Sequence, residues 1–266
     1  MLDIFRMDSR RLFQSRTFYI MLAITLALIV FVCLMLSIMS SPQVLRAMEE
    51  SGAEVEAADY QMGADIAGMS QLAFVHECLA NGFILILAGM GMTFFAGGDF
   101  AGGYIKNICF ARPRRWEYIA SKTLIGGVYS GVMTLLAVLF SLALPPLFGL
   151  RPTASGIGDV ASYTFWLWLP TWAFSLMALT MVTITRSASL GVFMSVFCGG
   201  GVPALVLGAF TGALGWPRVD KYFISSLVSV SCAPGVEQGG TILAGVAGWS
   251  LLYITASLLL TKNRDI

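Results

Sequence analysis

The chain reads TFFAGGDFAGGYIKNICFARPRRWEYIASK from Thr93 to Lys122, and this stretch lies between two long apolar runs. We call its charged part, Phe94 to Lys122, the basic segment. A positively charged segment between apolar runs is typical of a loop that joins two membrane-spanning helices. Such a loop either only anchors the two helices or also contacts a partner. Its cations are Lys106, Arg112, Arg114, Arg115 and Lys122.

The composition is that of a membrane protein. Hydrophobic residues make up 57% of the 266 residues and charged residues 12%, and the mean hydropathy is +0.80. Soluble domains contain about 25% charged residues. Because the apolar runs are also long enough for spanning helices, we expect an all-α integral membrane protein. The net charge of +1 gives no support for nucleic-acid binding.

The apolar runs predict one transmembrane domain over residues 1–266. A helix rises about 1.5 Å per residue, so a run of about 20 residues crosses a bilayer core of about 30 Å. Residues 1–16 predict a surface helix or a basic flank. Residues 40–75 predict an acidic external loop, and residues 215–240 an external segment with a re-entrant or interfacial helix. The six expected spans are at about 17–39, 76–96, 123–149, 163–184, 188–214 and 241–260.

The distribution of lysine and arginine predicts the orientation. If the N-terminus is cytoplasmic, six spans place 12 of the 16 lysines and arginines on the cytoplasmic side. They lie in residues 1–16, in the basic segment, in the turn at Arg186 and in the C-terminal tail. Cytoplasmic loops carry an excess of positive charge, so we expect both termini and the basic segment in the cytoplasm.

Two groups of residues in or beside the spans are candidates for a transport path. His76 and Glu77 stand at the external entrance of the second span, where an ionisable pair can gate the path, bind substrate or mark the headgroup boundary. Glycines and a proline in the fifth span predict a kink, a close helix contact or a break in the helix. Those residues are Gly199, Gly200, Gly201 and Pro203.

The sequence lacks the motifs of common nucleotide, metal and hydrolase sites. It has no GxxxxGK[ST] phosphate loop and no GxSxG nucleophile motif. The single histidine rules out a site with two histidine ligands, and the five cysteines have no CxxC spacing. We therefore expect no catalytic residue, metal or cofactor in this chain, and an energy source outside it.

The basic segment resembles the cytoplasmic segment between spans two and three of type-2 ABC exporter permeases. The resemblance is carried by Gly98-Asp99-Phe100, by the run Gly103 to Ile108, by Arg115 to Tyr118 and by Lys122. Tyr104 stands where threonine is usual in that family. The layout of six spans with a long first external loop is similar to the small permeases of bacitracin resistance and lantibiotic immunity.

The resemblance implies that the basic segment contains a coupling helix, which docks on a separate ATPase subunit in the cytoplasm. Gly102 and Gly103 would allow a sharp turn into this helix, and Pro113 would end it before the third span. Its aromatic and isoleucine side chains would supply an apolar face. The residues expected at the contact are Asp99, Gly103, Tyr104, Ile105, Lys106, Asn107, Ile108, Arg114 and Arg115.

By the same resemblance, the chain is the permease subunit of an exporter in the bacterial cytoplasmic membrane, and it is not itself an enzyme. Two copies of the ATPase subunit would bind ATP and Mg²⁺. A second permease chain, identical or similar, would complete the membrane unit among the lipids. The spans carry few charges, so we expect an amphipathic substrate, such as an antimicrobial peptide or a lipid-like molecule.

Two other classes of protein remain open at this point. A structural or assembly membrane protein outside the ABC class would use the basic segment only as an anchor. A membrane-embedded enzyme is disfavoured, because the spans lack paired carboxylates and clustered histidines that could act on a substrate.

Overall fold

The computed structural model describes residues 2–51, 61, 65, 68–104, 116–217, 219–229 and 236–263. This described part is built from helices, with one isolated β-bridge between Ser70 and Thr153. The α-helices are α1 Leu2–Gln14, α2 Arg16–Ser40, α3 Pro42–Glu50, α5 Gln71–Leu79, α6 Phe83–Ala101, α8 Trp116–Ala143, α9 Ile157–Thr185, α10 Ala188–Gly199, α11 Val202–Ala213, α12 Ile224–Ser229 and α13 Val236–Asn263. The two 3₁₀ helices are η1 Pro145–Phe148 and η2 Asp220–Tyr222.

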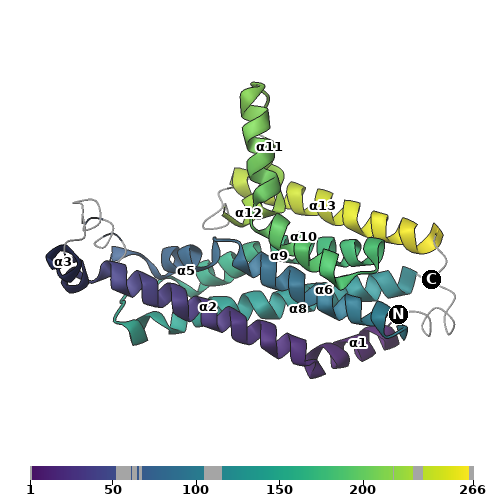
Figure 1. Ribbon diagram of the computed structural model, residues 1–266, viewed down its shortest axis with the longest axis horizontal. Coiled ribbons are helices and arrows are strands. Elements are labelled where there is room, and N and C mark those ends of the chain that lie inside the picture. Colours follow the sequence, from purple (N-terminus) through teal and green to yellow (C-terminus); the bar gives the residue numbers. More distant parts are fainter. Residues whose placement is uncertain are drawn as a thin grey trace.

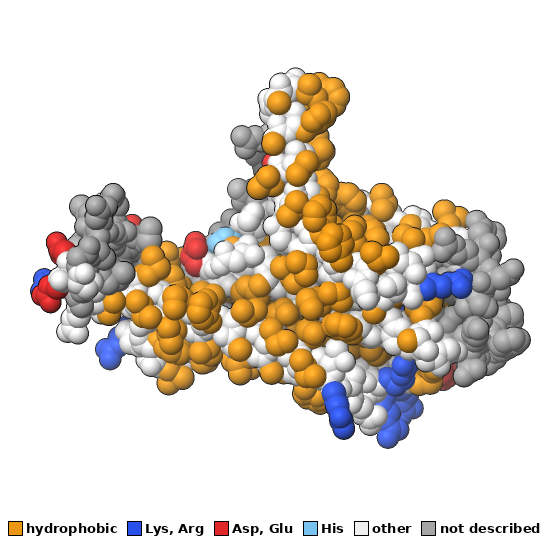
Figure 2. Space-filling view, viewed as in Figure 1, with side chains coloured by type: hydrophobic (Ala, Val, Ile, Leu, Met, Phe, Trp, Pro, Cys, Tyr) orange, Lys and Arg blue, Asp and Glu red, His pale blue; other side chains and the backbone are white. Residues whose placement is uncertain are grey.

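Five of the described helices are long and apolar enough to cross a membrane. They are α2, α6, α8 together with η1, α9 and most of α13. The pair α10 and α11 passes the same test but bends by 48°, so the described residues provide five spans, or six if the pair is one span. The prediction of helices, several of them long and apolar enough to cross a membrane, is confirmed for the described residues. Figure 2 shows hydrophobic side chains over the middle of the visible face and charged ones toward its two ends.

The central helix of the bundle is α9. It contacts α6, α8, α10 and α13, and 78% of its most apolar stretch is buried within the protein, against 22% for α2. Two of its buried hydroxyl groups are satisfied on the helix itself, since Thr171 and Thr180 each donate to the carbonyl four residues earlier at 2.8 Å. Figure 1 shows the spanning helices along the long axis, α1 and the last turns of α13 at the same end, and α11 projecting away.

The contact between α8 and α9 depends on small residues of α8. A Cβ atom at Gly127 would lie 3.2 Å from the indole nitrogen of Trp172, and one at Gly131 would lie 3.1 Å from that of Trp168. The two indole rings stack with their centroids 5.7 Å apart. Each indole N–H donates at 3.0 Å to a carbonyl of α8, Trp168 to Gly127 and Trp172 to Thr123. Small residues let membrane helices approach closely, and here two tryptophans fill the contact.

The structure divides the predicted span at 76–96 into α5 and α6. Gly82 lies between them with a φ of 74°, a left-handed conformation that glycine adopts without strain. A Cβ atom at Gly82 would lie 2.6 Å from the carbonyl oxygen of Gly199, at the end of α10. The turn therefore lets the backbone pass close to α10. The pair Asn81-Gly82 is a local turn signal within the range that was predicted as one span.

Short helices occupy the two segments that were expected outside the membrane. The described part of residues 40–75 contains α3 and the start of α5. The described part of residues 215–240 contains η2, α12 and the first turns of α13. The helix α12 contacts α9 and α13, and its Ile224, Leu227 and Val228 are buried. The apolar side chains of α12, within the predicted external segment 215–240, are thus packed on the bundle.

The close contact between α6 and α8 predicts that a side chain at Gly91 destabilises the bundle. A Cβ atom there would lie 1.8 Å from the hydroxyl of the buried Tyr129. We expect Gly91→Ala to lower the free energy of unfolding by about 1–3 kcal/mol, the usual cost of overpacking, with a lower Tm in detergent. Gly98→Ala on the same helix is the control, because a Cβ atom there meets no atom within 4 Å. Equal melting temperatures for the two variants would contradict this contact.

Candidate functional site

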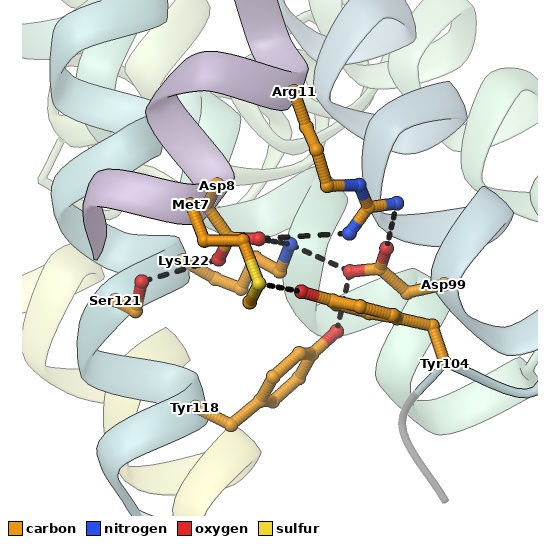
Figure 3. A network of polar contacts seen from close by, with 8 residues as sticks. All are labelled: Met7, Asp8, Arg11, Asp99, Tyr104, Tyr118, Ser121 and Lys122. Carbon is orange, nitrogen blue, oxygen red and sulfur yellow. Dashed lines mark hydrogen bonds and ion pairs between the residues drawn. The ribbon is translucent and has the colours of Figure 1, made fainter. Parts of the chain in front are cut away.

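Four charged side chains meet at the end of the bundle that carries α1 (Figure 3). Asp8 and Arg11 come from α1. Asp99 comes from the last turn of α6, and Lys122 comes from the start of α8. The side chains of Asp8, Asp99 and Lys122 are 0% exposed, and that of Arg11 is 37% exposed. We call this group the ion network, and its two cations balance its two anions.

The ammonium of Lys122 is the centre of the ion network. Its Nζ lies 2.6 Å from Oδ2 of Asp99 and 3.1 Å from Oδ1 of Asp8. Arg11 donates through Nη2 to Oδ1 of Asp99 at 2.8 Å. Its Nη1 lies 3.6 Å from Oδ1 of Asp8, beyond the range of a hydrogen bond. Each carboxylate therefore faces both cations, and three helices are joined at one point.

Two hydroxyl groups of α8 complete the bonding of the carboxylates. Tyr118 donates to Oδ2 of Asp99 at 3.2 Å, and Ser121 donates to Oδ2 of Asp8 at 3.1 Å. Buried polar atoms are stable only when they are hydrogen-bonded. Both oxygens of each buried carboxylate therefore have a partner from within the chain, whereas Nη1 of Arg11 is buried without a hydrogen bond to any described residue.

Aromatic rings cover the two cations. The Nζ of Lys122 lies 4.2 Å from the ring centroid of Phe95, and the guanidinium of Arg11 lies 4.0 Å from that of Tyr104. Cations are attracted to the faces of aromatic rings, more strongly when water is excluded. The hydroxyl of Tyr104 also lies 3.0 Å from the sulfur of Met7 on α1. Tyr104 thus contacts α1 twice, through its ring face at Arg11 and through its hydroxyl at Met7.

Burial and neighbouring charges shift the pKa values of Asp8 and Arg11, the two members of the ion network on α1. Burial raises the pKa of Asp8, and the positive charge of Lys122 offsets this in part. Burial acts to lower the pKa of Arg11, but the negative charge of Asp99 together with the hydrogen bonds to Asp99 and Tyr104 outweighs it, so the pKa of Arg11 lies above its usual value. Arg11 therefore stays protonated at every physiological pH.

The residues predicted at the ATPase contact fall into two sets. Asp99, Gly103 and Tyr104 are described, and Gly103 has a φ of 66°, a left-handed conformation that glycine adopts without strain. The carboxylate of Asp99 is enclosed in the ion network, although the resemblance placed it at the contact. The remaining predicted residues lie outside the described residues: Ile105, Lys106, Asn107, Ile108, Arg114 and Arg115. The coupling helix therefore stays a prediction.

The glycines and proline predicted in the fifth span lie at the bend between α10 and α11. Gly199 ends α10, Gly200 follows it, and Gly201 has a φ of 77°. Pro203 lies in the first turn of α11, where its missing N–H costs no hydrogen bond. A Cβ atom at Gly199 would lie 2.7 Å from the side chain of Ile86. These residues therefore combine a close helix contact with a change of direction.

His76 and Glu77 lie on α5, away from the ion network. The ring of His76 is half-buried and lies edge-on to Tyr163, with the centroids 6.1 Å apart. The side chain of Glu77 is exposed. Because α5 is a separate short helix, the pair lies outside the helices that are long enough to span. The predicted pair is therefore divided between a half-buried ring at His76 and an exposed carboxylate at Glu77.

The sequence analysis missed the contribution of α1 to the site. Ile4, Asp8 and Leu12 follow one another at intervals of four residues, which places them on one face of a helix, and all three are buried. A carboxylate in the middle of an apolar stripe requires a buried cation. That pattern is the signal in the sequence, but it does not identify Lys122 as the partner.

Removal of the central cation predicts a large loss of stability. Lys122→Met would leave two buried carboxylates with Arg11 alone, and breaking a buried ion pair typically costs about 3–5 kcal/mol. We expect a clear fall in the Tm of the detergent-solubilised protein. Lys221→Met is the control, because Lys221 is exposed. A Tm for Lys122→Met equal to that of the control would show that the ion network does not hold the helices together.

Comparisons with known proteins do not assign this chain to a family. No family model matches the chain, and no curated protein matches it. The function is therefore argued from the placement of the ion network and from the sequence of the basic segment beside it.

Proposed function

We propose that this chain is the permease subunit of an ABC exporter, which moves an amphipathic substrate with energy from a separate ATPase subunit. The observation that carries the proposal is the position of the ion network. It binds together the end of α6, the start of α8 and the helix α1. The chain between α6 and α8 is the part of the basic segment that resembles a coupling helix.

The ion network gives a physical route for transmitting force from that segment. On its N-terminal side, Tyr104 is stacked on Arg11 of α1. On its C-terminal side, Tyr118 donates to Asp99 of α6. A displacement of the chain between these two tyrosines would act on α6 and α8 together, and through Arg11 on α1. A segment that served only as a membrane anchor would not require both of its ends to be fixed in this way.

The enclosed position of Asp99 changes its role in this proposal. The carboxylate of Asp99 is buried and bound to Lys122, Arg11 and Tyr118. In this proposal it holds the helices at the base of the docking segment and does not touch the partner. The apolar residues Ile105 and Ile108 are then the proposed anchors on the ATPase surface. Buried apolar and aromatic anchors surrounded by polar residues carry most of the energy of protein interfaces.

The remaining parts of the proposal follow from the resemblance and from the charge distribution. The end that carries α1 would face the cytoplasm of a bacterial cell, because most lysines and arginines belong to it. Two ATPase subunits there would bind ATP and Mg²⁺, and this chain would bind no cofactor. A second permease chain would pair with it, and the bend at Gly199 to Gly201 would border the substrate path.

The proposal predicts that charges on the anchors separate the permease from its ATPase. The double variant Ile105→Asp and Ile108→Asp should weaken the association by at least about 2 kcal/mol, or roughly thirtyfold. The measurement is the ATPase activity that co-purifies with the tagged chain in lipid nanodiscs. Leu147→Asp, in the exposed η1, is the control and should keep that activity. Undiminished ATPase activity in the double variant would refute the docking role.

A further inference from the structure

A cavity of about 290 Å³ lies beside the ion network, between the junction of α1 with α2 and the neighbouring face of α6. Polar residues of the junction form one wall, namely Arg11, Gln14, Ser15 and Thr17. Gly98 and the aromatic side chains of α6 form much of the other. Pockets for small molecules typically measure about 300–1,000 Å³. This cavity is at the lower limit, so it suits a small headgroup better than a large ligand.

Hydrogen-bond donors surround the polar wall of the cavity. Arg11 has five N–H groups in its guanidinium, and within the described part of the chain its only hydrogen bond to a carboxylate runs from Nη2 to Asp99. The 25-residue helix α2 begins at Arg16, directly after its N-cap Ser15. The Oγ of Ser15 accepts from the N–H of Phe18 at 3.3 Å, and the other N–H groups in the first turn of a helix, with its partial positive charge, favour a bound anion.

The exposed charges on α1 and at the start of α2, the two helices that meet at the cavity, are mainly positive. Arg6, Arg10 and Arg16 are exposed on α1 and at the start of α2, and Asp3 is the exposed acid there. The two nearer acids, Asp8 and Asp99, are buried and neutralised by their cations. Figure 2 shows lysine and arginine side chains toward this end of the visible face. An anion that approached the cavity would therefore meet net positive charge.

Aromatic side chains place the cavity at the depth of lipid headgroups. Phe13, Tyr19 and Phe94 have 39%, 56% and 39% of their surfaces exposed around the junction, and Phe94 also lines the cavity. Exposed aromatic rings at the ends of spanning helices are typical of the boundary between lipid and water. Beyond them, the exposed Ile20 and Ile24 of α2 continue the apolar surface toward the membrane interior.

We propose that this cavity binds the phosphate headgroup of an anionic membrane phospholipid. The phosphodiester lies against Arg11 and the first turn of α2, and the acyl chains follow the exposed apolar side chains of α2 and α6. Clusters of basic residues beside a spanning helix recognise anionic lipids in this manner. The site does not depend on the exporter function, because it uses only the helix junction and the lipid around it.

The experiment fills the cavity without disturbing the ion network. Gly98 lines the cavity, and a Cβ atom there meets no atom within 4 Å, so Gly98→Leu should occupy free space and improve the helix propensity of α6. Gly248→Leu on α13 is the control, since a Cβ atom there also meets no atom within 4 Å. The full-length protein is placed in nanodiscs of phosphatidylcholine with rising fractions of phosphatidylglycerol, and co-purified lipid is counted by native mass spectrometry.

We expect the unmodified chain and Gly248→Leu to retain phosphatidylglycerol in preference to phosphatidylcholine, and Gly98→Leu to bind it about tenfold more weakly. Arg16→Gln, an exposed change beside the cavity, should reduce the preference several-fold and keep the fold intact. Unchanged retention in both Gly98→Leu and Arg16→Gln overturns the proposal, as does equal retention of the two lipids. Release of the lipid by millimolar inorganic phosphate would show that the site binds a free anion, and it would overturn the proposal that the ligand is a lipid.

Discussion

The end of the bundle that carries α1 depends on the burial of one ammonium group, that of Lys122. An ammonium that is removed from water is stable only when opposite charges contact it directly. The chain supplies them from two remote segments, Asp8 on α1 and Asp99 on α6. Because the side chain of Lys122 is completely enclosed, α1 has to lie against α6 and α8. A helix that reads as a surface element therefore becomes part of the bundle.

The same arrangement joins two features that the sequence presents separately. On one side of Arg11 lies Tyr104, after which the proposed docking segment begins. On another side lies the cavity at the junction of α1 with α2. Arg11 thus borders both, and any change in the position of α1 would affect the proposed docking segment and the cavity together. Activity that depends on anionic lipid would be a natural consequence of this geometry.

The sequence predicts the spans well where a helix is continuous and apolar. The predicted range 17–39 corresponds to α2 Arg16–Ser40, because a membrane helix satisfies all its backbone groups internally and needs only length and apolar side chains. Breaks are harder to predict. The turn at Gly82 divides the span predicted at 76–96. The pair Asn81-Gly82 is a local turn signal, but the close approach of Gly82 to Gly199 is a tertiary feature.

The ion network could be predicted only in part for a related reason. Asp99 and Lys122 were visible as charged residues at the ends of apolar runs. Their partner Asp8 lies 114 positions before Lys122, and a single sequence does not indicate which distant charges meet. The buried stripe of Ile4, Asp8 and Leu12 indicates that Asp8 needs a cation. The fold of the bundle determines which cation it is.

The central claim is that this chain works with a separate ATPase, and affinity purification from its native membrane tests that claim most directly. The tagged chain is extracted in a mild detergent, and the co-purified proteins are identified and quantified by mass spectrometry, with ATP hydrolysis measured on the same sample. The account predicts a partner with a GxxxxGK[ST] phosphate loop in about equal amount to this chain, and ATP hydrolysis by the complex. Purification of the intact chain with no such subunit and no ATP hydrolysis would contradict it.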